Sequence, residues 1–151
     1  MSEKSFVYLG NPNLKKVNVP VEFTQEQIQE FDLCSKDPLY FISNYVKIVS
    51  LDDGLVPFKM YGFQKEIVGT IHNNRFTICK LPRQSGKSTT IVSYLLHYAL
   101  FNPNCNIAIL ANKSSTARDI LGRLQLAYEN IPKFLQQGVL TVSYTHLTLP
   151  T

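Results

Sequence analysis

This sequence has few cysteines, and their spacing gives no sign of a disulfide framework. The three cysteines, Cys34, Cys79 and Cys105, are single and widely separated along 151 residues. The first residues also lack the basic and then apolar pattern of a secretory signal peptide. We therefore expect a protein of a reducing cytoplasm.

Long hydrophobic runs are also absent. The longest nearly apolar stretch, residues 91–101, is interrupted by Ser93 and His97 and is too short to span a bilayer. Internal repeats and low-complexity tracts are missing as well. The hydrophobic content of 44% and the charged content of 17% are ordinary for a globular protein, and 151 residues correspond to about one domain or a piece of one.

Acidic residues are scarce in one segment of the chain. Between residues 59 and 87 there is one acid, Glu66, against six basic residues: Lys59, Lys65, Arg75, Lys80, Arg83 and Lys87. A segment of this charge favours anions, although a solvated basic face would show the same pattern.

The amino-terminal part predicts an irregular arm over residues 1–23, followed by a helical subdomain over residues 24–57. Thr24 and Gln27 have the spacing of a capping box, which predicts a helix from residue 24 to about residue 34. A second helix is predicted to begin at Asp37-Pro38 and to run through Val49. Residues 52–54, Asp-Asp-Gly, predict the turn that ends it.

The rest of the chain predicts alternating helices and strands. Helices are expected over residues 64–73 and 86–101 and from about residue 114 to Pro132, and strands over residues 76–81 and 107–111. On the last helix the apolar residues share one face, whereas the charged residues mostly turn away from it: Arg118, Asp119, Arg123 and Glu129. Two strands joined through a helix form a parallel unit, so we expect an α/β fold with an incomplete parallel sheet and the chemistry at the carboxyl ends of its strands.

The segment KLPRQSGKSTTIV, residues 80–92, lies at that place between a predicted strand and a predicted helix. A strand before it and a helix after it direct backbone N–H groups and the positive end of a helix dipole to one point, which favours phosphate. Gly86 lets a phosphate approach the backbone, Lys87 can reach the β and γ phosphates, and the Ser88 hydroxyl can ligate Mg²⁺. Thr89 adds a donor at the start of the helix.

Two residues depart from the usual phosphate-binding loop. Leu81, followed by Pro82, stands where glycine is expected, so the chain must enter the loop differently. Arg83 lies inside the loop, where its guanidinium could stabilise the charge that develops on a γ-phosphate, or could form a structural ion pair instead. We take Lys87 and Arg83 as candidate catalytic residues.

An aromatic element about twenty residues ahead of the loop ends in a glutamine. The amide of Gln64 matches the N6/N7 edge of adenine, and Tyr61 or Phe63 could stack on the base, which favours ATP over GTP. Core packing is the plainer explanation for these aromatics. The candidate nucleotide-binding residues are Gln64, Arg83, Gln84, Ser85, Gly86, Lys87, Ser88 and Thr89, and the candidate metal ligand is Ser88.

Together these segments resemble the amino-terminal ATPase domain of the large terminase subunit of tailed bacteriophages, of the T-even-like myovirus group. The resemblance covers about residues 22–140, and it is most specific in Tyr61-Gly-Phe-Gln64 and in the Arg-Gln-x-Gly-Lys-Ser loop at residues 83–88. It implies a P-loop NTPase fold of the three-layer RecA-like type, with the partial ATPase core at residues 58–140. It also implies Gln64 as adenine reader, Arg83 at the γ-phosphate, Lys87 at the phosphates and Ser88 at Mg²⁺. Lys113 and Ser114 would belong to a coupling surface or to a solvated loop.

The resemblance further implies that the intact protein couples ATP hydrolysis to the movement of DNA into a prohead and that a nuclease domain cuts the DNA. Its partners would then be double-stranded viral DNA, the portal protein, the small terminase subunit and further copies in a ring, in the host cytoplasm and without a membrane.

One departure bears on activity. The family needs an acidic Walker B strand and a catalytic glutamate, and this chain has no acid after Glu129. Residues 141–151 carry four threonines and no charge, and we expect them to be a non-native tail. We therefore expect this chain to hydrolyse ATP poorly. A helicase-type P-loop motor, or a non-catalytic module that docks a partner through residues 1–57, remains as an alternative.

Overall fold

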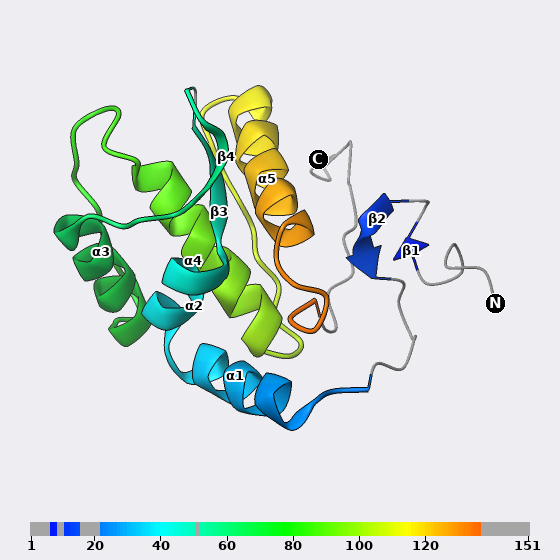
Figure 1. Ribbon diagram of the computed structural model, residues 1–151. Helices are drawn as coiled ribbons and strands as arrows, with labels where there is room; N and C mark the ends of the chain where they lie inside the picture. The colour runs from blue at the N-terminus through cyan, green and yellow to red at the C-terminus, as the bar shows by residue number, and fades with distance from the viewer. Residues whose placement is uncertain (1–6, 9–10, 16–21, 51, 137–151) are drawn as a thin grey trace.

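The computed structural model describes residues 7–8, 11–15, 22–50 and 52–136 (Figure 1). Its elements are β1 (Val7–Tyr8), β2 (Asn11–Lys15), α1 (Gln25–Lys36), α2 (Pro38–Tyr45), β3 (Lys47–Ser50), β4 (Gly54–Pro57), α3 (Gly62–Asn73), α4 (Lys87–Phe101) and α5 (Ser114–Glu129). The α/β class is confirmed, because helices and strands are both present. The described strands, however, form two separate antiparallel pairs, β1 with β2 and β3 with β4.

The first two helices begin as their capping residues predict. Thr24 Oγ1 accepts a hydrogen bond from the Gln27 backbone N–H at 3.2 Å, and Gln27 Oε1 accepts one from the Thr24 N–H at 3.1 Å. Asp37 starts α2, with its carboxylate accepting from the Leu39 N–H at 2.8 Å. These bonds satisfy N–H groups that the first turn of a helix leaves without a backbone partner.

Residues 46–49 correct the predicted second helix. The helix ends at Tyr45, and residues 47–50 instead form β3, which pairs with β4 from Lys47 opposite Pro57 to Ser50 opposite Gly54. The β-branched residues there favour an extended chain, and the turn at residues 52–54 brings a partner strand alongside. The predicted end of a helix is therefore the tip of a hairpin.

Helix α4 lies at the centre of the described fold and contacts α2, α3 and α5 (Figure 1). The core around it consists of buried apolar side chains: Cys34, Phe41, Ile42, Val46, Phe58, Val68, Tyr94, Leu96, Leu100, Ala127, Tyr128, Ile131 and Leu135. Buried side chains lie on several sides of α4, which agrees with its nearly all-round apolar sequence.

The prediction of parallel strands over residues 76–81 and 107–111 is wrong. Neither segment has a described hydrogen-bonded neighbour, so the expected incomplete parallel sheet and its three layers are not seen. Both segments nevertheless alternate between half-buried and exposed residues, which is the period of an extended chain. A strand is defined by a partner, and a local sequence pattern supplies only the extended conformation.

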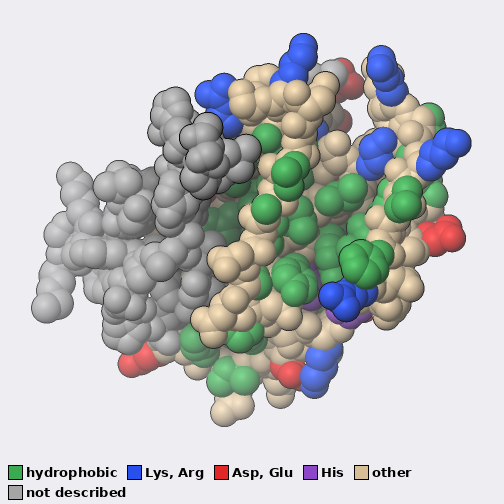
Figure 2. Space-filling view, turned by 180° about the vertical axis from the view of Figure 1, so that it is seen from behind, with side chains coloured by type: hydrophobic (Ala, Val, Ile, Leu, Met, Phe, Trp, Pro, Cys, Tyr) green, Lys and Arg blue, Asp and Glu red, His purple; other side chains and the backbone are tan. Residues whose placement is uncertain are grey.

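Both extended segments border an open hollow of about 880 Å³ over one side of α4. Thr77 and Cys79 line it from the first segment and Ile107 from the second, and Tyr94 and Leu95 line it from α4. Figure 2 shows hydrophobic side chains gathered in the middle of the molecule as seen from behind, with lysines and arginines towards the top and the right-hand edge. The outward residues Phe76, Ile78 and Leu110 are 84%, 96% and 88% exposed.

The ends of the chain add two findings. The predicted irregular arm contains the strand pair β1–β2, and the Gln136 side-chain amide donates to the Asn13 carbonyl at 2.8 Å, which links this arm to the end of the described fold. Residues 141–151, the expected non-native tail, lie outside the described residues. None of the helices in the described part of the chain is long and apolar enough to cross a membrane.

Candidate phosphate-binding site

The loop at residues 82–86 joins the first extended segment to α4 through two left-handed residues. Gln84 has φ of 62° and Gly86 has φ of 72°, and Gly86 is the N-cap of α4. Turns that contain left-handed residues can group successive backbone N–H donors into a concave anion site, and here the group lies at a helix N-terminus. Two further bonds hold the loop: Ser85 Oγ donates to the Pro82 carbonyl at 3.0 Å, and Thr90 Oγ1 donates to the Gly86 carbonyl at 3.1 Å.

A hollow of about 450 Å³ follows this loop. It is lined by Pro82, Arg83, Gln84, Ser85, Gly86, Lys87, Ser88, Thr89 and Arg123. Three of these residues are cationic, and none carries a carboxylate. Within the described part of the chain, the ion pair is Lys36 with Asp32, so no acid there neutralises Arg83 or Lys87. The charge and the loop geometry both favour a phosphate group, and the structural ion pair considered for Arg83 is absent from the described residues.

A second, larger hollow of about 740 Å³ lies on the other side of the loop. It is bordered by the aromatic element, including Phe58, Tyr61 and Phe63, and by Ile48 of β3. Tyr61 and Phe63 stack on each other with ring centroids 5.9 Å apart and planes 8° apart. Tyr61 is 69% exposed, so its ring presents an open apolar surface next to the phosphate-binding loop.

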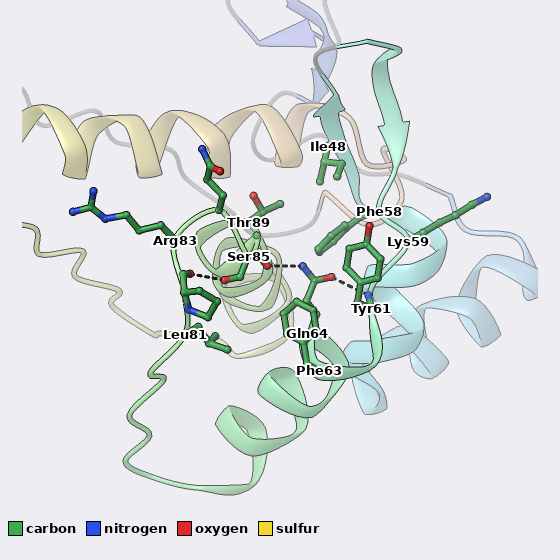
Figure 3. A pocket seen from close by; sticks show the side chains of 13 residues that line it. Ile48, Phe58, Lys59, Tyr61, Phe63, Gln64, Leu81, Arg83, Ser85 and Thr89 are labelled. Carbon is green, nitrogen blue, oxygen red and sulfur yellow. Dashed lines mark hydrogen bonds between the residues drawn. The ribbon is translucent and has the colours of Figure 1, made fainter.

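Gln64 lines the 740 Å³ hollow and connects the aromatic element to the loop. Its side chain is 3% exposed, its Oε1 accepts from the Tyr61 backbone N–H at 2.9 Å, and its Nε2 donates to the Ser85 carbonyl at 3.3 Å (Figure 3). Both ends of the amide are thus used within the protein, by the aromatic element and by the loop. The proposed reading of adenine by Gln64 stays a prediction, and it would require the amide to exchange one of these partners for the base.

Gly86 is required at its position for two reasons. Its φ lies in the left-handed region, and a Cβ there would come within 2.6 Å of Gln64 Nε2. The glycine therefore allows Gln64 to contact the loop, besides leaving the backbone open to a ligand.

The predicted loop residues do not all face the same way. Arg83 extends away from Tyr61 and Gln64 (Figure 3), and it borders both hollows, as do Gln84, Ser85, Gly86 and Thr89. Lys87 and Ser88 line the 450 Å³ hollow and not the aromatic one. The loop therefore has an aromatic side, which faces the 740 Å³ hollow (the aromatic hollow), and a cationic side, which faces the 450 Å³ hollow (the cationic hollow).

The residues fit magnesium only in part. The Ser88 hydroxyl is exposed at the cationic side, where a bound cation could reach it. No carboxylate lines this hollow, and the described residues contain no group of three or more histidine, cysteine or acidic side chains suited to a metal ion. Ser88 is thus a candidate ligand without described carboxylate partners.

Sequence reasoning missed two lining residues. The sequence pattern predicts a helix at Ile48, whereas this residue belongs to β3 and from there lines the aromatic hollow. The sequence predicts that Arg123 turns away from the apolar face of its helix. The side chain does so, and on that side of α5 it meets the phosphate-binding loop. Helical periodicity gives the face of a residue but not the neighbour that this face meets. Lys113, the N-cap of α5, and Ser114 are exposed and line neither hollow, so the expected coupling role stays a prediction.

The chain also matches a known protein family over part of its length. Residues 78–147 match the family described as terminase large subunit, T4likevirus-type, N-terminal. The matched range contains the whole loop, α4 and α5, and Arg123 with them. It begins after the aromatic element, so Gln64 and Tyr61 lie outside it. Over residues 78–147 this chain is similar to the amino-terminal part of T4likevirus-type terminase large subunits.

Proposed function

We propose that this chain carries the ATP-binding site of a viral DNA-packaging motor. The observation that supports the proposal most strongly is the acid-free hollow of about 450 Å³, which the N-terminus of α4, Arg83, Lys87 and Ser88 line within the family-matched range. A site of this kind suits a phosphate chain better than a neutral ligand, because all of its charged side chains are cationic and its backbone N–H groups are hydrogen-bond donors.

The two sides of the loop give the nucleotide a direction. The adenine occupies the aromatic hollow beside Tyr61 and Phe63, and the phosphates cross the loop to the side of Lys87 and Ser88. Base stacking on an exposed ring contributes binding energy without needing a specific hydrogen bond, whereas Gln64 supplies the selectivity for adenine. Because Gln64 also donates to Ser85, base binding and loop position are linked through one amide.

In the reaction that we propose, the residues of the loop bind and orient the phosphates. Lys87 offsets the charge of the β and γ phosphates, and Arg83 offers a bidentate contact to oxygens on which charge builds up during transfer. Ser88 contributes a ligand to Mg²⁺, which offsets phosphate charge when it is bound. The acid and the base that activate water are not among the residues that line this hollow, so we expect tight binding and slow turnover by the present chain.

The similarity to this family supports a proposal for the wider role. We propose that the intact protein uses ATP hydrolysis to translocate double-stranded viral DNA into a prohead in the host cytoplasm, as a ring of copies that works with the portal protein and the small terminase subunit. The basic segment over residues 59–87 is compatible with anionic partners of this kind.

Calorimetric titration of the 151-residue chain with Mg²⁺ and AMP-PNP, a slowly hydrolysed ATP analogue, tests the site. We expect Lys87→Ala to raise Kd at least tenfold, because it removes the mobile charge at the phosphates. Lys80→Ala is the matched control, since Lys80 is exposed and lines neither hollow, and it should change Kd less than twofold. Phosphate release from ATP, measured on the same samples, should stay near the background rate.

Two results would overturn the proposal. Equal Kd values for the Lys87→Ala and Lys80→Ala chains would show that the loop does not hold the phosphates. Absence of any nucleotide binding by a folded chain would favour the alternative of a partner-docking module. Rapid Mg²⁺-dependent turnover that Lys87→Ala abolishes would instead contradict the expected slow hydrolysis.

A further inference from the structure

Arg123 lies at the phosphate-binding loop although it comes from another element. It belongs to α5, and it is the residue from outside positions 82–89 that lines the cationic hollow. It also borders a smaller hollow of about 280 Å³ between β3, α4 and α5, where Thr89 is again a neighbour. In Figure 3, α5 crosses above the loop, on the side away from α3. Arg123 therefore faces the loop from a helix that begins about 25 residues after it.

The guanidinium of Arg123 has no partner among the described residues. It is exposed, it takes part in no ion pair there, and no acidic side chain lines either of the two hollows that it borders. An arginine that supports a fold by charge needs a carboxylate or a set of carbonyl acceptors, because it carries five donors. Phosphate oxygens satisfy the same donors in a bidentate manner.

The neighbours of Arg123 indicate which end of a nucleotide it would meet. It shares its hollow with Lys87 and Ser88, which do not line the aromatic side of the loop. Arg123 is itself absent from the aromatic hollow. A triphosphate that places its base beside Tyr61 therefore brings its last phosphate, rather than its sugar, to Arg123.

We propose that Arg123 contacts the terminal phosphate of bound ATP and so distinguishes ATP from ADP at this site. The inference rests on the proposed function, since it assumes a nucleotide in the loop. The contact joins α5 to the loop only while the terminal phosphate is present. Because Ala127 and Tyr128 of α5 are buried in the core with α4, loss of that phosphate changes the charge contacts between two packed helices.

The test compares two nucleotides on five chains. The wild-type chain, Arg123→Ala, Arg123→Lys, Arg118→Ala and Lys87→Ala are titrated calorimetrically with Mg²⁺ and either AMP-PNP or ADP. Arg118 is an exposed arginine of the same helix that lines neither hollow, so its replacement controls for the loss of one positive charge from α5. Circular dichroism and the urea midpoint of each chain report whether it is folded.

We expect Arg123→Ala to raise Kd for AMP-PNP about tenfold or more and to change Kd for ADP less than threefold. A bidentate, charge-assisted hydrogen bond to phosphate is commonly worth a factor of this size. Arg123→Lys should recover part of the loss, because a point charge replaces the bidentate fork, and Arg118→Ala should leave both values within twofold.

The outcomes separate the two proposals. If Lys87→Ala weakens AMP-PNP binding but Arg123→Ala does not, the role of Arg123 is wrong and the site itself stands. If Arg123→Ala weakens AMP-PNP and ADP equally, or Arg118→Ala has the same effect, Arg123 acts through general charge and does not read the terminal phosphate. If Lys87→Ala binds AMP-PNP as well as the wild-type chain does, or if the folded wild-type chain binds no nucleotide, the proposed function is wrong, and the role of Arg123 is wrong with it.

Discussion

At the scale of single residues, Gly86 and Gln64 form the contact on which the shape of the site depends. The missing side chain of Gly86 leaves room for the Gln64 amide, which in turn holds the Ser85 carbonyl on one side and the Tyr61 N–H on the other. The amide is buried, so leaving either of its ends without a partner would cost on the order of 1–3 kcal/mol. The position of the loop and the start of α3 are therefore coupled.

Replacing this glycine by alanine should damage both binding and stability. Gly86→Ala forces a Cβ into the left-handed region and to 2.6 Å from Gln64 Nε2, so we expect a loss of about 1–3 kcal/mol in unfolding free energy and at least a tenfold rise in Kd for AMP-PNP. Urea unfolding and calorimetric titration measure the two effects.

Gly69→Ala is the matched control for this change. Gly69 lies inside α3, and a Cβ there meets nothing within 4 Å. Alanine is the better helix former, so this variant should be as stable as the wild-type chain or more stable by up to about 1 kcal/mol. Equal loss in both variants would mean that the loop has no special need for glycine at position 86.

The residues of the loop could be predicted from the sequence because their chemistry is local. A glycine, a lysine and a hydroxyl ahead of a helix define a phosphate site by their own backbone, and the structure indeed brings residues 83–89 around one hollow. Arg123 and Ile48 could not be predicted in the same way, since each reaches the site through the packing of α5 or the pairing of β3. Contacts between elements depend on tertiary structure that one local pattern does not encode.

At the scale of elements, the helices could be predicted more readily than the strands for a related reason. Thr24 and Gln27 cap α1 through bonds that span three residues, and a proline in the first turn marks the start of α2. Residues 76–81 and 107–111 carry an equally clear extended pattern, yet no described neighbour pairs with them. A helix satisfies its backbone within its own residues, whereas a strand needs another chain segment.

Polar contacts join α1 to its neighbours α2 and α4. Glu30 of α1 accepts from Tyr40 and Tyr45 of α2 at 2.7 and 2.6 Å, and these hydrogen bonds, the one from Tyr45 foremost, lower the pKa of its carboxyl group. His97 of α4 contacts the Cys34 carbonyl of α1 at 2.9 Å; because a carbonyl only accepts, His97 Nε2 is the donor. Burial is the main cause that lowers the pKa of His97 below 6.5.

The buried histidine should make the packing of α1 on α4 sensitive to mild acid. With a folded-state pKa below the unfolded value near 6.5, the unfolded chain binds a proton more readily, so stability is complete above about pH 6.5 and falls as the pH drops towards the folded pKa. The loss in this window can reach about 1.4 kcal/mol per pH unit. Urea unfolding at pH 7.5, 6.5, 5.5 and 5.0 measures it.

His97→Gln provides the comparison. Glutamine keeps an N–H donor and does not titrate, so this variant should be less stable at pH 7.5, by about 1–2 kcal/mol, but should lose less stability between pH 6.5 and 5.0. The groups that act on His97 are His72, which opposes its charge, and Asp37, which favours it. Protonation of Glu30 lowers the stability only below about pH 4.5, since the pKa of this carboxyl group is lowered in the folded chain. An unchanged pH dependence in His97→Gln would assign the acid sensitivity to another group.

At the scale of the whole molecule, the described fold has one well-packed side and one side that remains open. The helices bury an apolar core around α4, whereas the two extended segments present Phe76, Ile78 and Leu110 almost fully to solvent. Unpaired extended backbone next to exposed apolar side chains is a common origin of association between chains. The helical half should thus hold the fold of the chain, and the open face should limit its solubility.

Introducing charge on the open face should reduce association without loss of structure. The double variant Ile78→Lys with Leu110→Lys changes two side chains that are 96% and 88% exposed, so we expect an unchanged helix signal and urea midpoint. Sedimentation velocity over a concentration series should show a clear shift towards monomer relative to the wild-type chain. Ile28→Lys on α1, where the side chain is 52% exposed, adds charge away from this face and is the control.

If Ile28→Lys shifts the distribution as far as the double variant, net charge and not the open face governs association. If the double variant unfolds, the two side chains support the fold in a way that their exposure does not suggest.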